Sequence, residues 1–223
     1  MAQTEETDTG SHKGLKAGGD LTIRSGSFTV DTADDAIHTN ADLTIAAGTF
    51  VLKSGDDAIQ DDGNVVIEDG TFDISCCYEG IEGLTLTING GEYDIVSSDD
   101  GLNAANGSGA ASNDPFAADE SCWIVINGGT VISSACSNSA DSGLDSDNGI
   151  YINGGTVVAG GNMYDAVDGG DQTYAVFQFA QRQSGGQTYT LKNGAGETVL
   201  EMTPANDFQY LVVSSPDLAE GDY

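Results

Sequence analysis

The segment LTIAAGTFVL at residues 43–52 decides the fold, because the chain repeats its pattern. Each copy has two short runs that alternate apolar and polar residues, and a glycine stands between the runs. The copies are LTIRSGSFTV at 21–30, LTIAAGTFVL at 43–52, VVIEDGTFDI at 65–74, LTINGGEYDI at 86–95, IVINGGTVIS at 124–133 and IYINGGTVVA at 150–159. Such alternation is typical of half-buried strands, and repetition at a steady period indicates a stacked repeat protein.

The length of the period indicates the kind of repeat. The glycines between the two runs are 22, 22, 21, 38 and 26 residues apart. A coil of about 22 residues accommodates three short strands and their turns, which make one circuit of a parallel β-helix. Successive coils then stack about 4.8 Å apart. We therefore predict an all-β protein, a parallel β-helix (β-solenoid) of about six or seven coils.

Stacking in register places equivalent residues of successive coils in columns. One predicted interior column is aliphatic: Ile23, Ile45, Ile67, Ile88, Ile126 and Ile152. A second column is aromatic: Phe28, Phe50, Phe72 and Tyr93. At the bend after the isoleucine, later coils predict an asparagine ladder: Asn89, Asn127 and Asn153. Because one coil cannot cover its own core, we expect the coils to fold only as a stack.

The period divides the chain into three parts. Residues 1–13 are small and polar and predict a flexible N-terminal segment, and residues 14–171 carry the repeats. The long step contains an insertion at 104–121 that is rich in Ala, Ser, Asn and Gly, which predicts a surface loop. From residue 172 the period is lost. Alternating runs with Asn-Gly turn chemistry then predict a β-strand cap over the last coil, at 172–223.

Charge limits the function classes. The chain has 36 acidic residues against 6 Lys and Arg, a net charge of −30. A nucleic acid or an anionic membrane surface requires basic residues, so the charge argues against both as partners. No run of about 18 apolar residues exists, and we predict no membrane insertion. With 39% hydrophobic residues at regular spacing the chain is predicted to fold, and its carboxylates then need cations.

An acidic motif follows the second run of each coil. Clear copies are DDAI at 34–37, DDAI at 56–59, YEGI at 78–81 and DDGL at 99–102, and weaker ones are DSGL at 141–144 and YDAV at 164–167. The second position of the motif places carboxylates of successive coils on one edge of the solenoid. Carboxylates about 4.8 Å apart repel by roughly 1 kcal/mol at the dielectric of water, and by more near protein.

Calcium suits this row of carboxylates, because it takes about six to eight oxygen ligands in flexible geometry. The predicted ligands are Asp34, Asp35, Asp56, Asp57, Glu79, Asp99, Asp100 and Asp165. The alternative is that these side chains hydrogen-bond turn amides or face water. The four cysteines match no zinc-site spacing, and either free thiols or a disulfide fit the sequence.

Together these motifs resemble a bacterial family of carbohydrate-binding domains known from clostridial cell-surface proteins. The D-D-A/G-I/L corner, the L-T-I-x-x-G-T-F runs, INGGTV at 126–131 and LVVSSPDL at 211–218 carry the resemblance, which covers residues 14–223. It implies a right-handed parallel β-helix similar in fold to pectate lyases, bound Ca2+, and an extracellular or cell-surface location. It also implies binding of plant-type polysaccharides, either uronate-rich and pectin-like or cellulose-like.

Two aromatic residues are the predicted carbohydrate contacts. Trp123 and Tyr151 fall at the first run of neighbouring coils, where their rings can stack on sugar rings. The alternative is that they cover the insertion or pack against the cap.

Two other function classes are considered. A calcium-dependent polysaccharide lyase of the pectate type needs a base beside the uronate carbon that loses a proton. The candidate bases are scattered along the chain: Arg24, His38, Lys53, Arg182 and Lys192. We therefore predict no catalytic residue and no enzyme. A structural β-solenoid, as in an adhesin or stalk, is the other alternative. Ice binding is disfavoured, because Glu92 interrupts the outward column of hydroxyl residues.

Overall fold

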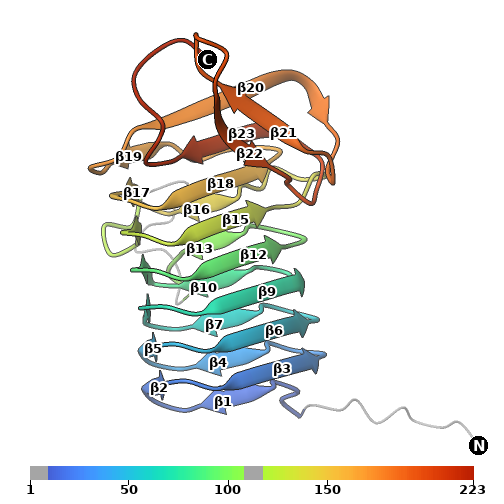
Figure 1. The fold of residues 1–223 in the computed structure, drawn as a ribbon. Coiled ribbons are helices and arrows are strands. Elements are labelled where there is room, and N and C mark those ends of the chain that lie inside the picture. Colours follow the sequence, from blue (N-terminus) through green and yellow to red (C-terminus); the bar gives the residue numbers. More distant parts are fainter. Residues whose placement is uncertain (1–9, 108–117) are drawn as a thin grey trace, which may run out of the picture.

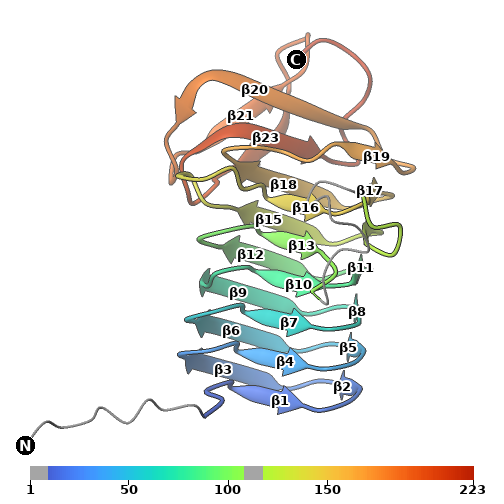
Figure 2. The same ribbon diagram turned by 180° about the vertical axis from the view of Figure 1, so that it is seen from behind.

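The computed structural model describes residues 10–107 and 118–223. Strands wind through three parallel sheets, coil upon coil, and form a column with a cap at its C-terminal end (Figure 1). The view from behind shows the same stack, with β1 at the end opposite the cap (Figure 2). The described residues form no helix, and so none that could cross a membrane. The predicted all-β parallel β-helix is confirmed, and its longest purely parallel sheet has seven strands.

Each of the six complete coils that the structure describes passes through sheets A, B and C in turn. Sheet A consists of β1 (Leu15–Ala17), β4 (Ile37–Thr39), β7 (Ile59–Asp61), β10 (Ile81–Gly83), β13 (Leu102–Ala104) and β16 (Leu144–Ser146). Sheet B consists of β2 (Leu21–Ile23), β5 (Leu43–Ile45), β8 (Asn64–Ile67), β11 (Thr85–Ile88), β14 (Trp123–Ile126), β17 (Gly149–Ile152) and β19 (Val167–Gly169). The parallel part of sheet C consists of β3 (Ser27–Thr32), β6 (Thr49–Ser54), β9 (Thr71–Cys76), β12 (Glu92–Val96), β15 (Thr130–Ser134) and β18 (Thr156–Gly161).

Neighbouring coils pair in register, and like residues meet across each pair. Ile23 pairs with Ile45, and Phe28 pairs with Phe50. The predicted isoleucine column is confirmed, since each of its members is at most 6% exposed. The aromatic column is also confirmed. From Phe28 to Tyr93 successive ring centroids are 5.0, 4.6 and 4.7 Å apart, and the ring planes are within 3° of parallel.

The corner between sheets B and C needs glycine. Gly48 has a φ of +151°, and a Cβ there would lie 2.8 Å from the Phe50 ring. Gly129 has a φ of +88°, and its Cβ would lie 2.6 Å from the carbonyl oxygen of Gly91 in the coil below. Both the backbone conformation and the packing exclude a side chain at this corner. The glycine between the two sequence runs is therefore required by the turn.

Asparagines beside this corner form the predicted ladder. Asn127 Nδ2 donates to Asn89 Oδ1 at 2.8 Å, and Asn153 Nδ2 donates to Asn127 Oδ1 at 2.7 Å. Asn89 Nδ2 continues the chain to Glu68 Oε2 at 2.9 Å. An amide carries both a donor and an acceptor, so a column of asparagines satisfies itself.

After β19 the chain turns back over the last coil. β20 (Tyr174–Gln183) and β23 (Phe208–Ser214) extend sheet C as antiparallel strands, and β21 (Tyr189–Lys192) and β22 (Thr198–Met202) form a separate hairpin. Their apolar residues build a second small core. The cap is also tied to the side of the column, because Asn206 Nδ2 donates to three backbone carbonyl oxygens of Ser97, Ser134 and Ala135 at 3.0 Å.

Two expected segments are described only in part. Residues 1–9 of the N-terminal segment and 108–117 of the insertion loop lie outside the described residues. His12 and Lys13, which the sequence assigns to the flexible segment, contact Asp34 of the first acidic corner. The four cysteines are free thiols.

Replacing Phe50 by alanine tests the stacked core. Phe50 is fully buried between two parallel rings, so Phe50→Ala opens a cavity and should lower the free energy of unfolding by about 3–5 kcal/mol. Chemical denaturation followed by circular dichroism measures this loss. Phe28→Ala is the control, because Phe28 ends the column and is only half-buried, and its loss should be smaller. Equal losses in the two variants would contradict the columnar core.

Candidate functional site

The acidic motif forms the corner at which each coil passes from sheet C to sheet A. The backbone holds its second residue in register with the coil above, through amide-to-carbonyl bonds of 2.9–3.1 Å. These bonds run from Gly14 to Asp35, Ala36 to Asp57, Ala58 to Glu79, Gly80 to Asp100 and Gly101 to Ser142. The structure therefore stacks four of the predicted ligands, which we call the carboxylate ladder: Asp35, Asp57, Glu79 and Asp100.

Three of the four ladder residues are buried, and the fourth, Asp100, is half-buried. Asp35, Asp57 and Glu79 are 2%, 7% and 9% exposed. The first residues of the motifs are half-buried or exposed: Asp34, Asp56 and Asp99. Burial at this depth means that water solvates the ladder carboxylates poorly, and their charge needs a partner.

Glu82 joins the ladder from sheet A. Carboxylate oxygens of Asp57, Glu79 and Glu82 all lie within 4.8 Å of one another. The backbone N–H of Glu79 donates to Asp57 Oδ1 at 2.9 Å, and Asn103 Nδ2 donates to Glu79 Oε2 at 3.0 Å. Sequence reasoning missed Glu82, which stands between Gln60 and Asn103 in the outward column of sheet A. Each residue of this column follows a ladder residue by three positions, and this constant spacing is the signal that could have identified Glu82.

A second group of carboxylates lies one coil higher. Oxygens of Glu79, Asp99 and Asp100 lie within 4.8 Å of one another. The backbone N–H of Ser142 donates to Asp100 Oδ1 at 2.6 Å. Asp145 on β16 adds a further negative charge beside Asp100. It is the register partner of Asn103 on β13, and sequence reasoning missed it too.

Burial raises the pKa of these carboxyl groups. The pKa is about 7 for Asp57 and Glu82, and about 8 for Glu79 and Asp100. Desolvation is the largest cause, and repulsion between the carboxylates adds to it. Within the described residues, none of the four forms an ion pair with Lys, Arg or His. A bound cation would offset this uncompensated charge.

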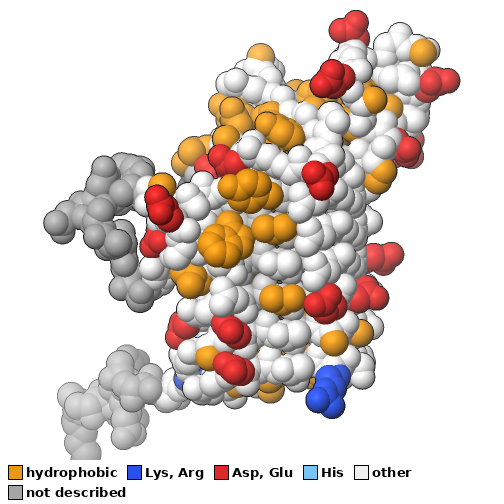
Figure 3. Space-filling model, turned by 90° about the vertical axis from the view of Figure 1, so that its left-hand side faces the viewer, with side chains coloured by type: hydrophobic (Ala, Val, Ile, Leu, Met, Phe, Trp, Pro, Cys, Tyr) orange, Lys and Arg blue, Asp and Glu red, His pale blue; other side chains and the backbone are white. Residues whose placement is uncertain are grey.

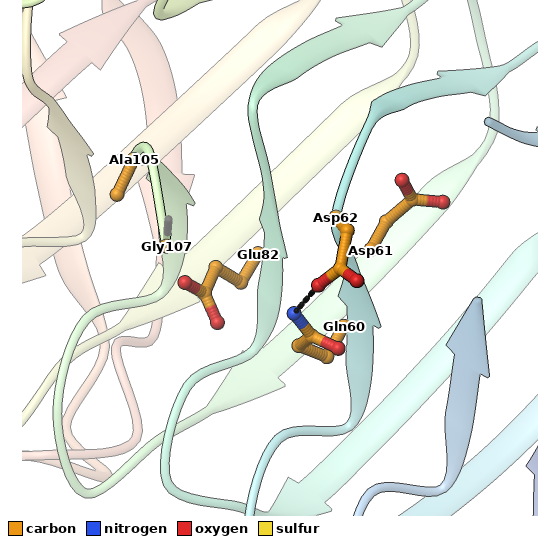
Figure 4. A pocket seen from close by; sticks show the side chains of 6 residues that line it. All are labelled: Gln60, Asp61, Asp62, Glu82, Ala105 and Gly107. Atoms are coloured by element: carbon orange, nitrogen blue, oxygen red, sulfur yellow. Dashed lines mark hydrogen bonds between the residues drawn. The ribbon is translucent and has the colours of Figure 1, made fainter. Parts of the chain in front are cut away.

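Two amide side chains flank Glu82 with unused oxygens. Gln60 Oε1 and Asn103 Oδ1 are buried and have no hydrogen-bond partner. Gln60 and Glu82 line a hollow on the face of sheet A, where Gln60 Nε2 donates to Asp62 Oδ1 at 3.2 Å (Figure 4). Carboxylate and amide oxygens are the ligands that Ca2+ takes. The residues present around Glu82 therefore fit this ion.

The first corner differs, because a lysine lies in it. Carboxylate oxygens of Asp34, Asp35 and Asp56 also lie within 4.8 Å of one another. Lys13 Nζ is 2.9 Å from Asp34 Oδ1 and forms a second ion pair with Asp35. The hydrogen bond from Lys13 lowers the pKa of Asp34 to about 2. Two of the predicted calcium ligands are thus already paired with a cation of the chain.

Asp165 does not stand on the ladder, and the register that the sequence predicts for it is wrong. β18 ends at Gly161 and β19 begins at Val167, which leaves too few residues for another strand of sheet A, so β19 enters sheet B directly. Asp165 Oδ2 instead accepts a hydrogen bond from the backbone N–H of Ser146 at 3.1 Å, at the opposite end of the sheet A strand. The last coil lacks the corner that the ladder requires.

The two predicted sugar contacts lie on the outer face of sheet B. Trp123 begins β14 and is 37% exposed, and Tyr151 lies in the next strand, β17, and is 39% exposed. Hydrophobic side chains gather on the upper part of this face and continue toward the cap (Figure 3). Val125 pairs with Tyr151, so an apolar residue fills the place beside it.

Glycine lets the Tyr151 ring lie along the sheet. Gly149 is the register partner of Trp123, and a Cβ at Gly149 would lie 3.1 Å from both Cε2 and Oη of Tyr151. The ring therefore covers Gly149 instead of standing away from the strand. This places a half-exposed ring face beside the Trp123 position, which is a shape that a sugar ring can stack on.

The residues considered as lyase bases lie at separate places. Lys53 is exposed on β6, and Arg24 is exposed after β2. His38 on β4 is buried, with Nδ1 2.9 Å from Asp35 Oδ2. Arg182 and Lys192 lie in the cap, on β20 and β21. In residues 10–107 and 118–223 these side chains form no common cluster beside the carboxylates.

Comparison with known proteins identifies a family. Residues 1–58 and residues 52–166 each match the family model described as carbohydrate-binding domain-containing protein. Together the two matches cover more than half of the 223 residues. No curated protein and no solved structure matches the chain.

The pH dependence of stability tests the carboxylate ladder. The pKa values of Asp57, Glu79 and Asp100 in the folded protein exceed those of the unfolded chain, about 4, so folding without metal is favoured at low pH. In chelator, the melting temperature should therefore fall as pH rises from about 4 through about 8. Millimolar calcium should reverse most of the fall at pH 8, because it replaces the protons. A Glu79→Gln variant should show a smaller fall. A flat profile in chelator would contradict the assignment.

Proposed function

Because the chain belongs to the carbohydrate-binding domain family, we propose that it is a non-catalytic, calcium-dependent polysaccharide-binding protein. The observation that carries the proposal is the exposed aromatic pair Trp123 and Tyr151 on neighbouring coils of sheet B. The proposed ligands are plant-type polysaccharides, either uronate-rich and pectin-like or cellulose-like. Such polymers lie outside cells, so we also propose an extracellular or cell-surface location.

The aromatic pair supplies the apolar contact that a polysaccharide needs. A sugar ring presents C–H groups on its faces and hydroxyl groups at its edge, and an aromatic face matches the former. Trp123 and the flattened Tyr151 offer two such surfaces on one side of the column. Rigid aromatic side chains lose little conformational entropy when a ligand binds them, so they are effective anchors.

Calcium would have two roles: it would neutralise the carboxylates of the ladder, and it would bridge the protein to an acidic polysaccharide. Asp57, Glu79 and Glu82 would hold one ion, with the unused oxygens of Gln60 and Asn103 beside them. Glu79, Asp99 and Asp100 form a second group of the same kind one coil higher. Since the protein carries a net charge of −30, an acidic polysaccharide is repelled unless cations lie between the two polymers.

Gel retardation in the presence of polysaccharide tests the aromatic contacts. We expect Trp123→Ala and Tyr151→Ala each to weaken binding about tenfold, because each removes a stacking surface. Tyr164→Ala is the control: Tyr164 is 38% exposed, and its ring lies tilted against that of Tyr210 in the cap, with the ring centroids 5.3 Å apart. A loss equal to that of the control would exclude the sheet B face.

Adding one methyl group at Gly149 tests the geometry of the platform. The new Cβ in Gly149→Ala would meet the Tyr151 ring at 3.1 Å and lift it from the sheet. Binding should fall several-fold while the melting temperature changes little, because the displaced atoms belong to the exposed end of a side chain. Unchanged affinity in this variant would mean that the flat ring does not contact the sugar.

Thermal stability tests the calcium sites. An ion at a hundredfold excess over its Kd stabilises the native state by about 2.7 kcal/mol, which raises the melting temperature of a chain this long by about 5–10 °C. Magnesium should do less, because it requires stricter octahedral geometry. Asp57→Asn and Asp100→Asn should each reduce the calcium gain, whereas Asp94→Asn, on the outer face of sheet C, should not.

The same preparations distinguish binding from catalysis. A binder retards in gels that contain polygalacturonate with calcium and leaves the polymer intact. A lyase produces unsaturated oligosaccharides that absorb in the ultraviolet. Sustained release of such products would replace the binding proposal by the lyase alternative. Binding of acidic polymer that is equally strong in chelator would contradict the role of calcium as a bridge.

A further inference from the structure

We infer that the ammonium group of Lys13 prevents divalent ions from binding at the first acidic corner, and so determines where along the column they bind. The inference rests on the proposed calcium function and concerns the lower end of the same carboxylate ladder. It assigns a role to a residue that lies in the segment preceding the first strand, β1.

Lys13 occupies the ladder position of the first coil. Leu15 pairs with Ile37, and the backbone N–H of Gly14 donates to the carbonyl oxygen of Asp35 at 2.9 Å. Residue 13 is therefore the register partner of Asp35, directly below it. The residues KGLK at 13–16 correspond to DAIH at 35–38, with a lysine in place of the acidic residue. The column of carboxylates begins with an ammonium group.

The ammonium group lies among the carboxylates that would otherwise form a metal site. Lys13 Nζ donates to Asp34 Oδ1 at 2.9 Å and also to Asp35 Oδ2. The Lys13 side chain is 16% exposed, and that of Asp35 is 2% exposed. His38 adds a ring nitrogen 2.9 Å from Asp35 Oδ2. Asp56, the third member of the group, is the exposed one.

Among the described residues, the ion pairs of Lys and His with carboxylates are confined to the first corner. The group formed by Asp57, Glu79 and Glu82 has the same compactness, yet it has no ion pair within the described residues. A divalent ion entering the first corner would have to displace Lys13 and lie beside it, and like charges at such a separation repel strongly. An ion entering the next corner meets only carboxylate and amide oxygens. The structure thus favours ions at the middle of the ladder and not at its lower end.

Counting bound calcium ions tests the inference. Lys13→Met removes the ammonium group and keeps the apolar stem, and the variant should bind one more calcium ion per molecule than the parent in equilibrium dialysis. Lys16→Met is the matched control, because it removes the same charge from an exposed residue of β1 and should leave the count unchanged. In chelator, Lys13→Met should also melt below the parent, and calcium should restore it.

A second variant decides the question where Lys13→Met fails to fold. Asp35→Asn should bind as many calcium ions as the parent, because Asp35 is paired with Lys13, whereas Glu79→Gln should bind fewer. Loss of an ion from Asp35→Asn, or equal counts for the two lysine variants, would overturn the inference. If the parent binds no calcium, the proposed calcium function fails. If only Lys13→Met binds an ion, the inference that Lys13 keeps divalent ions out of the first corner is still supported. If neither the parent nor Lys13→Met binds an ion, the inference is overturned.

Discussion

Backbone hydrogen bonds between parallel coils, about 4.8 Å apart, are the constraint on which the rest of this structure depends. They hold each residue directly above its equivalent in the coil below, so wherever the repeat keeps a residue type, like side chains meet. Phe50 stacks between two phenylalanines, and Asn127 bonds to asparagines on both sides. For apolar and amide side chains this repetition stabilises the fold. For carboxylates it accumulates repulsion that the backbone register does not allow them to escape.

The ladder shows how the same backbone accommodates that repulsion in different ways along its length. At the lower end the chain supplies its own cation, Lys13, and the pKa of Asp34 is low. At the middle, burial without a cation raises the pKa of Glu79 to about 8. A group with such a pKa binds a proton or a metal ion according to pH. The arrangement links the stability of the column to the ions around it, which suits the proposed calcium-dependent binding of polysaccharide.

The aromatic face depends on the register in another way. Tyr151 lies flat because its neighbour along the strand, Gly149, has no side chain. The same register places Trp123 beside Gly149, so the two aromatic residues come together from successive coils. The proposed binding surface and the core are therefore built from the same repeat. The inward residues of each run stack, and outward residues of sheet B form the surface that we propose for the ligand.

The sequence by itself determined the fold, the interior columns, the asparagine ladder and the acidic edge, because a constant period specifies which residues stack. Only the tertiary structure decided the composition of the site. Glu82, Gln60 and Asn103 come from sheet A and differ in residue type. The position they share therefore shows no repeated residue type in the sequence. The acidic pattern did not predict Lys13, because a basic residue stands at an acidic position of the column. Asp165 does not stack on the ladder, because the last coil omits sheet A. Periodicity predicts which residues lie above one another, whereas side-chain chemistry across sheets depends on how the chain turns each corner.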